Sequence, residues 1–167
     1  MIGVSPLICA APKVTGLSVT IRPAAKSDAR RIAELNCCLA EESEGKRLDG
    51  PTVLAGVEVL LDTPGYGRYY LADDGTETVG QLLITFEWSD WRNGQFWWLQ
   101  SVYVAPRYRR QGIFTMLFGH IALLAEQDPS VCGLRLYVDE RNQHALDTYR
   151  ALGLEYSGYR VMERTLD

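Results

Sequence analysis

The sequence lacks the features that mark several broad classes of protein. It contains only two histidines, and its four cysteines form no CxxC pair beside a histidine, which argues against a metal site. The cysteines are Cys9, Cys37, Cys38 and Cys132. No apolar run approaches the roughly 20 residues that span a bilayer. We therefore expect a cytoplasmic protein with reduced thiols, no bound metal and no membrane contact.

A basic stripe is also missing. The formal net charge is -4 and the sequence pI is about 5.2, a balance that repels a phosphate backbone. Low-complexity tracts and internal repeats do not occur either. Nucleic acid is accordingly not an expected partner.

The length of 167 residues suits one ordinary domain with its own core. Residues 1–17 contain Pro6, Pro12 and Gly16 and lack the long apolar region of a signal peptide. We predict a flexible N-terminal arm over residues 1–17 and a single domain over residues 18–167.

Apolar periodicity predicts a mixed order of strands and helices. The expected strands are 18–23, 66–73, 78–88, 96–104, 134–138 and 156–166, and the expected helices follow Ser27-Asp28, Pro51 and Gly112 and span 142–152. Such an order predicts an α/β (α+β) sandwich, in which helices flank a mixed, mostly antiparallel sheet with at least one parallel crossover.

The most informative segment runs from Val102 to Phe114, where a strand passes through a basic, glycine-bearing loop into a helix. The unpaired amides and the positive dipole end of a first helical turn favour an anion. Gly112 lets the backbone approach a ligand closely because it has no Cβ. The pattern suits a pyrophosphate, although a basic loop before a helix is also common as a solvated cap.

Two motifs in this chain resemble those of the GNAT superfamily of N-acetyltransferases. The first is the Val-x-Val-x-Pro strand end of residues 102–106, followed by Arg-x-x-Gly and an apolar helix. The second, residues 142–154, has an Asn that opens a helix, a Tyr within it and a Gly at its end. The resemblance covers roughly residues 18–167 and implies the GNAT acyl-CoA N-acyltransferase fold, with the sheet splayed between strands 4 and 5.

The resemblance also implies acetyl-CoA as the donor. The pantetheine arm would bond to the strand edge, and the pyrophosphate to loop amides and arginines. The residues implied are Val102, Tyr103 and Val104 for pantetheine, and Arg107, Arg109, Arg110, Gln111, Gly112, Ile113, Phe114 and Thr115 for phosphate. Asn142 would bond the pantetheine or hold the splay, and Tyr149 would protonate the leaving thiolate as general acid.

Two positions depart from the family pattern. The family usually has a small residue where Phe114 stands, and glycine is common at the position of Arg110. Phe114 would narrow the phosphate pocket if it pointed there, and would leave it open if it pointed into the core.

The general base is harder to assign. An amine with a pKa near 10.4 must lose a proton before it attacks a thioester. Some family members carry a carboxylate on the strand before the phosphate loop, but residues 96–104 offer Gln100 instead. Glu87 is our candidate for the base, with Asp90 as its neighbour, acting directly or through water; a solvated turn explains the same residues.

Other side chains have both structural and functional interpretations. Trp97 and Trp98 must face opposite sides of the sheet, so at most one reaches the active-site face. The acidic residues between the first two helices suit a cationic amine or a solvated helix end: Glu41, Glu42, Glu44 and Asp49. His120 and His144 are expected to be structural.

The leading prediction is an acetyl-CoA-dependent N-acetyltransferase. A primary amine, from a small molecule or a protein, would attack the donor directly, since no covalent-catalysis motif is present. The alternatives are a catalytically inactive acyl-CoA-binding sensor or assembly module, and a structural protein that uses the fold without the donor. Exposed edge strands and the aromatic hairpin of residues 88–98 also predict a homodimer.

Overall fold

The structure is a computed structural model that describes residues 18–166. The predicted N-terminal arm, residues 1–17, lies outside this range and stays a prediction. Within the described residues no helix has the length and apolarity needed to cross a membrane.

Five strands form one sheet in the order β1-β2-β3-β4-β5. They are β1 (Thr20–Pro23), β2 (Arg68–Asp73), β3 (Thr78–Ser89), β4 (Gly94–Val104) and β5 (Val131–Leu136). Neighbouring strands pair antiparallel, except for β4 and β5, which run parallel. The mixed, mostly antiparallel sheet predicted from the sequence is confirmed.

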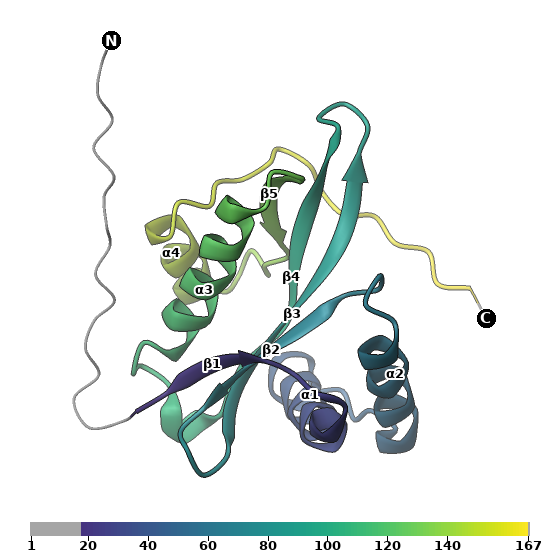
Figure 1. The fold of residues 1–167 in the computed structure, drawn as a ribbon, viewed down its shortest axis with the longest axis vertical. Coiled ribbons are helices and arrows are strands. Elements are labelled where there is room, and N and C mark those ends of the chain that lie inside the picture. Colours follow the sequence, from purple (N-terminus) through teal and green to yellow (C-terminus); the bar gives the residue numbers. More distant parts are fainter. Residues whose placement is uncertain (1–17, 167) are drawn as a thin grey trace.

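Helices cover both faces of the sheet, with α1 and α2 on one side and α3 and α4 on the other (Figure 1). They are α1 (Ala29–Glu44), α2 (Gly50–Asp62), α3 (Ile113–Gln127) and α4 (Gln143–Ala151), with short 3-10 turns η1 (Lys26–Asp28) and η2 (Pro106–Tyr108). Asp49 caps α2 by accepting the Thr52 amide at 3.0 Å. Asp28 precedes α1 but its side chain does not cap that helix, because the carboxylate accepts from Arg22 and from the Ala25 amide.

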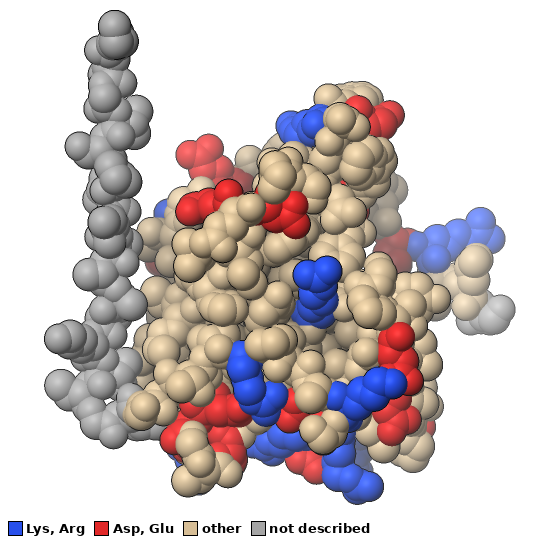
Figure 2. All heavy atoms as spheres, in the orientation of Figure 1, with Lys and Arg blue, Asp and Glu red and all other residues tan. Residues whose placement is uncertain are grey.

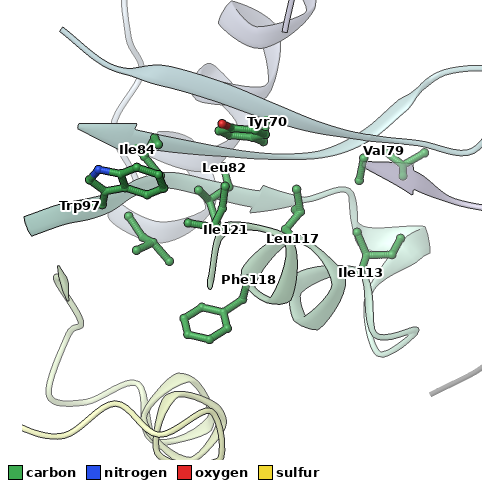
Figure 3. Close-up of a cluster of buried hydrophobic side chains, with 11 residues drawn as sticks. Tyr70, Val79, Leu82, Ile84, Trp97, Ile113, Leu117, Phe118 and Ile121 are labelled. Carbon is green, nitrogen blue, oxygen red and sulfur yellow. The ribbon is translucent and has the colours of Figure 1, made fainter. Parts of the chain in front are cut away.

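Two apolar clusters hold the helices on the sheet. The larger lies under α3, where Leu82, Ile84 and Trp97 meet Leu117 and Ile121 (Figure 3). The smaller cluster lies under α1 and α2 and includes Leu83, which directly follows Leu82 in β3. Alternate residues of β3 therefore serve opposite faces. Complete burial of each Leu or Ile stabilises the fold by about 1.5–3 kcal/mol, so this alternation fixes which face each neighbouring side chain occupies.

The predicted closing strand over residues 156–166 is wrong. The chain has no strand there, and this segment exposes Tyr159, Val161 and Met162 to solvent. Gly158 has a positive φ of 83°, which interrupts an extended run. In Figure 1 the segment runs from α4 across the view, past β5 and the β3–β4 hairpin. Its β-forming residues therefore lack the neighbouring strand that a ladder requires.

The parallel pairing of β4 with β5 ends early. The last paired residues are Leu99 and Leu136, whereas β4 continues to Val104. Within the described chain, the β5 side of β4 therefore has no neighbouring strand from Gln100 onward. The predicted splay between strands 4 and 5 is confirmed, and it lies directly before the glycine-bearing loop.

A β-bulge interrupts β4 within its unpaired half. Leu83 pairs with Gln100, but Gln81 pairs with Tyr103, so β4 carries one extra residue between these pairs. Ser101 lies at the bulge with a positive φ of 46°, a conformation that few residues other than glycine adopt. The bulge shifts the alternation of side chains along the rest of β4.

Candidate active site

The loop between β4 and α3 exposes a row of backbone amides. Arg110 and Gly112 have positive φ values of 60° and 78°, and Gly112 is the N-cap of α3. Within residues 18–166, the amides of residues 110–115 have no hydrogen-bond acceptor. Six successive free donors at a helix N-terminus suit an anion. This is the position at which the sequence predicted phosphate binding.

Three successive side chains fasten this loop to the rest of the molecule. Arg107 forms an ion pair with Glu77, and the Tyr108 hydroxyl donates to Asp74. The Arg109 guanidinium forms an ion pair with Glu42 of α1. Of the three arginines expected to meet phosphates, only Arg110 has no acidic partner within the described residues. The other two act first in holding the loop.

The Phe114 ring packs away from the free loop amides. Its ring packs edge-on against Tyr149 at 5.6 Å between centroids and against Phe118 at 6.1 Å. It belongs to the apolar contacts around the larger core cluster. The departure from the family pattern therefore places an aromatic ring between α3 and α4, and leaves the loop amides open.

A cavity of about 310 Å³ lies between α3, β5 and the end of α4, and a second of about 270 Å³ adjoins the splayed half of β4. The walls of the second cavity come from β4, α1 and the loop. They consist of Leu39, Glu42, Ser43, Val102, Tyr103, Val104 and Arg109. The three β4 residues predicted to carry the pantetheine arm are thus brought together beside an open volume.

Tyr149 and Asn142 lie at different places on α4. Asn142 is the N-cap of the helix, and its side-chain oxygen accepts the Ala145 amide at 3.1 Å. Tyr149 is half-buried against Phe114, and its hydroxyl has no partner within the described chain. Burial raises the pKa of Tyr149, which keeps the phenol protonated. A protonated, unengaged hydroxyl suits a proton donor.

Glu87 is engaged by two donors on the α1 side of the sheet. Its carboxylate accepts from the Trp98 indole and forms an ion pair with Arg135 at 2.8 Å. Asp90 lies in the exposed hairpin turn and accepts the amide of the next residue at 2.9 Å. Gln100 donates to the Thr85 hydroxyl at 2.6 Å. Of these three residues, Glu87 is the one whose side chain is held by two other side chains of the described residues.

The two adjacent tryptophans of β4 face opposite sides, as predicted. Trp97 is only 4% exposed and belongs to the core under α3. Trp98 stacks on Tyr137 at 4.4 Å, with Arg135 beside it. Neither Tyr137 nor Arg135 is part of a motif, and their place at the end of the parallel strand β5 is the only sequence signal that marks them. Together these side chains form an aromatic surface beside the splay.

The acidic residues around the end of α1 do not act as one group. Glu42 pairs with Arg109, Glu44 pairs with Lys46 at 2.6 Å, and Asp49 caps α2. On the face drawn in Figure 2, acidic and basic side chains lie interleaved over the lower half. Most of these carboxylates are therefore engaged by neighbouring groups.

The histidines and cysteines show no catalytic grouping in the described residues. The His120 ring lies 5.4 Å from that of Tyr70, and His144 is exposed on α4. Cys37, Cys38 and Cys132 are free thiols. No group of three or more potential metal ligands occurs between residues 18 and 166.

Comparisons with known proteins agree with this geometry. The model of the acetyltransferase (GNAT) family matches residues 30–154. Thialysine N-epsilon-acetyltransferase from Bos taurus is 33% identical over 151 residues, which covers 82% of this chain and 84% of the relative. The Sus scrofa protein of the same name is 32% identical over 150 residues, covering 81% and 84% of the two chains.

A solved structure gives the same result. A protein described as a possible acetyltransferase from Clostridium difficile 630 superposes with a TM-score of 0.84 at 41% identity. The match covers 89% of this chain and 98% of that protein. None of these comparisons supports the alternative of a catalytically inactive binding module.

Proposed function

Since this chain belongs to the acetyltransferase (GNAT) family and is an N-acetyltransferase, we propose that it acetylates the terminal primary amine of a small, flexible, lysine-like molecule. The acetyl group comes from acetyl-CoA, and the amine attacks it directly in a ternary complex. The observation that carries the proposal is the continuity of the unpaired β4 edge with the row of free amides at the start of α3.

The donor side fits acetyl-CoA in both shape and chemistry. The free amides of residues 110–115 suit the pyrophosphate, and Arg110 supplies an unengaged positive charge. The main chain of Val102, Tyr103 and Val104 suits the pantetheine arm, which would take the place of the missing strand neighbour. Asn142 contributes by holding the start of α4 beside the splay.

The chemistry requires three proton transfers around one acyl transfer. The ammonium of the substrate loses one proton to Glu87, directly or through water, and the neutral amine nitrogen then bonds to the acetyl carbon. As the carbon–sulfur bond breaks, the Tyr149 hydroxyl donates its proton to the leaving sulfur, and the nitrogen passes its second proton through water to the Tyr149 phenolate, which leaves a neutral amide and the CoA thiol. A main-chain amide of β4 polarises the acetyl carbonyl, so catalysis depends chiefly on positioning.

The relatives favour a small-molecule acceptor. Two of them are named for acetylation of the N-epsilon position of thialysine, a lysine analogue, and each covers more than four fifths of this chain. The aromatic surface of Trp98 and Tyr137 lies beside the splay with the carboxylate of Glu87, a combination that suits the aliphatic chain and the cationic end of such a molecule.

The first experiment is thermal unfolding of the purified protein with acetyl-CoA, free CoA and NAD. At 100 times its dissociation constant a ligand adds about 2.7 kcal/mol to stability, which raises the midpoint by roughly 5–10 °C in a domain of this size. We expect a rise with both CoA ligands and none with NAD. CoA release is then measured with thialysine, lysine, spermidine, an aminoglycoside and a peptide amine. No rise at millimolar CoA, or release with the peptide alone, would contradict the proposal.

We further propose a cytoplasmic homodimer. The free thiols in the described chain suit a reducing compartment. The dimer is supported by large exposed apolar side chains at the hairpin tip, Trp91 at 87%, and in the C-terminal segment, Met162 at 95%. Light scattering at micromolar concentration tests the dimer.

A further inference from the structure

The carboxylate of Glu42 joins helix α1 to the anion-binding loop. It accepts a hydrogen bond from the Tyr103 hydroxyl at 2.5 Å and forms an ion pair with Arg109. Tyr103 belongs to the splayed half of β4, and Arg109 immediately precedes the row of free amides. One side chain of α1 thus contacts both parts of the donor site.

The donors to Glu42 are themselves held in place. Arg109 Nε donates to the Val104 carbonyl at 2.8 Å, and its guanidinium lies 5.4 Å from the centre of the Tyr103 ring. Tyr103 is only 6% exposed. It reaches the α1 side because the bulge at Ser101 turns it there, opposite Gln81, which donates to Asn36 of α1. The cluster therefore depends on the bulge.

The charges within this cluster support one another. The hydrogen bond from Tyr103 and the ion pair with Arg109 lower the pKa of Glu42, so its carboxylate stays ionised. Burial and the neighbouring carboxylate raise the pKa of Tyr103, so its hydroxyl stays a donor. At neutral pH the Glu42 carboxylate and the Tyr103 hydroxyl are therefore both in the protonation state that their hydrogen bond requires.

The neighbours of Glu42 on α1 have no such role. The side chain of Glu41 is exposed and makes no hydrogen bond or ion pair within the described residues, and Glu44 pairs with Lys46. Of these three carboxylates, only Glu42 contacts the donor loop.

We infer that Glu42 is a positioning residue for the donor: it holds Tyr103 and Arg109 so that the splayed β4 edge and the loop amides are aligned before acetyl-CoA binds. This inference rests on the proposed function, and it differs from the sequence-based expectation of a contact with the amine. A loop ordered in advance loses less conformational entropy when its ligand binds. Removal of the carboxylate should therefore weaken donor affinity and leave the acceptor site largely intact.

The test compares Glu42→Gln with Glu41→Gln, a matched change one residue away. Calorimetric titration with free CoA should give a Kd about tenfold higher for Glu42→Gln, the size expected for loss of one charged hydrogen-bonded contact. Glu41→Gln should leave the CoA Kd unchanged. Tyr103→Phe, which keeps the ring but not the hydroxyl, should raise the CoA Kd about threefold, and the double variant with Glu42→Gln should show less than the combined effect.

Steady-state kinetics and the unfolding midpoint separate a role of Glu42 in donor binding from a contact with the amine and from a purely structural role. At saturating acetyl-CoA, Glu42→Gln should keep the wild-type kcat and the wild-type KM for the amine within about twofold. An unchanged CoA Kd together with a raised amine KM would show an acceptor contact and overturn the inference. A lower unfolding midpoint with an unchanged CoA Kd would show a purely structural role and overturn it too. Failure of the wild-type protein to bind CoA would instead overturn the proposed function itself.

Discussion

The two sides of the splay differ in how firmly they are held. On one side, β4 lies between two paired strands and continues into a loop whose Arg107, Tyr108 and Arg109 each contact an acidic residue from a distant part of the chain. On the other side, β5 is an edge strand with all six residues partly exposed, and α4 buries only Leu146. The donor would lie between a preorganised surface and a less firmly packed one.

This difference separates binding from chemistry. The groups proposed for donor affinity belong to the β4 side, whereas the proposed acid, Tyr149, belongs to the α4 side. A change on the β4 side should therefore act mainly on the Kd for CoA, and a change on the α4 side mainly on kcat.

The largest effect is expected on the α4 side. Tyr149→Phe removes the proposed proton donor and keeps the ring contact with Phe114, so kcat should fall about 100-fold while the CoA Kd stays the same. Steady-state kinetics and calorimetry measure the two quantities. Because burial raises the pKa of Tyr149, wild-type kcat should be lost on the alkaline side only above about pH 10. Tyr156→Phe, at an exposed tyrosine, is the control. If Tyr149→Phe also raised the CoA Kd about 100-fold, binding and chemistry would not be divided between the two sides.

A smaller effect is expected on the β4 side. Gly112→Ala adds a Cβ where φ is 78°, which strains the backbone by about 1–2 kcal/mol and should weaken CoA binding roughly five- to thirtyfold. Gly119→Ala is the matched control, because Gly119 lies inside α3 with open space around its Cβ position. That control should gain about 0.5–1 kcal/mol in unfolding free energy and bind CoA normally. A normal CoA Kd in Gly112→Ala would show that the loop conformation is not needed.

The smallest effect is expected beyond α4. Ending the chain at Glu155 removes exposed residues, so the unfolding midpoint at low protein concentration should change by no more than about 3 °C. In light scattering, the full chain should have the mass of a dimer and the shortened chain that of a monomer. A fall of 10 °C or more would mean that the segment packs on its own domain, and a monomeric full chain would refute the dimer.

Sequence patterns predicted the structural features that neighbouring residues determine. The apolar stripe of α3, the start of α2 near Pro51 and the glycine at the start of α3 all depend on a few neighbouring residues, and the structure confirms each. The two motif segments also lie on the predicted elements, which identified the family. Local periodicity was sufficient for these features because neighbouring residues determine them.

Contacts between distant residues could not be read in this way. The partners of Arg107 and Arg109 are 30 and 67 residues away in sequence, and no pattern near the loop indicates them. Strict alternation along β4 would place Tyr103 on the same face as Trp97 and Leu99, away from Glu42. The prediction of a closing strand over residues 156–166 was wrong for a related reason, since β-forming residues become a strand only beside a partner strand.

The bulge at Ser101 divides β4 into two stretches in which different positions face the core. Before it, odd-numbered positions such as Trp97 and Leu99 serve the core; after it, even-numbered positions such as Val102 and Val104 do. Loss of a single residue here would thus exchange inward and outward side chains throughout the donor edge, although every remaining amino acid would be unchanged. In evolution, this point of the chain should tolerate substitution far better than insertion or deletion.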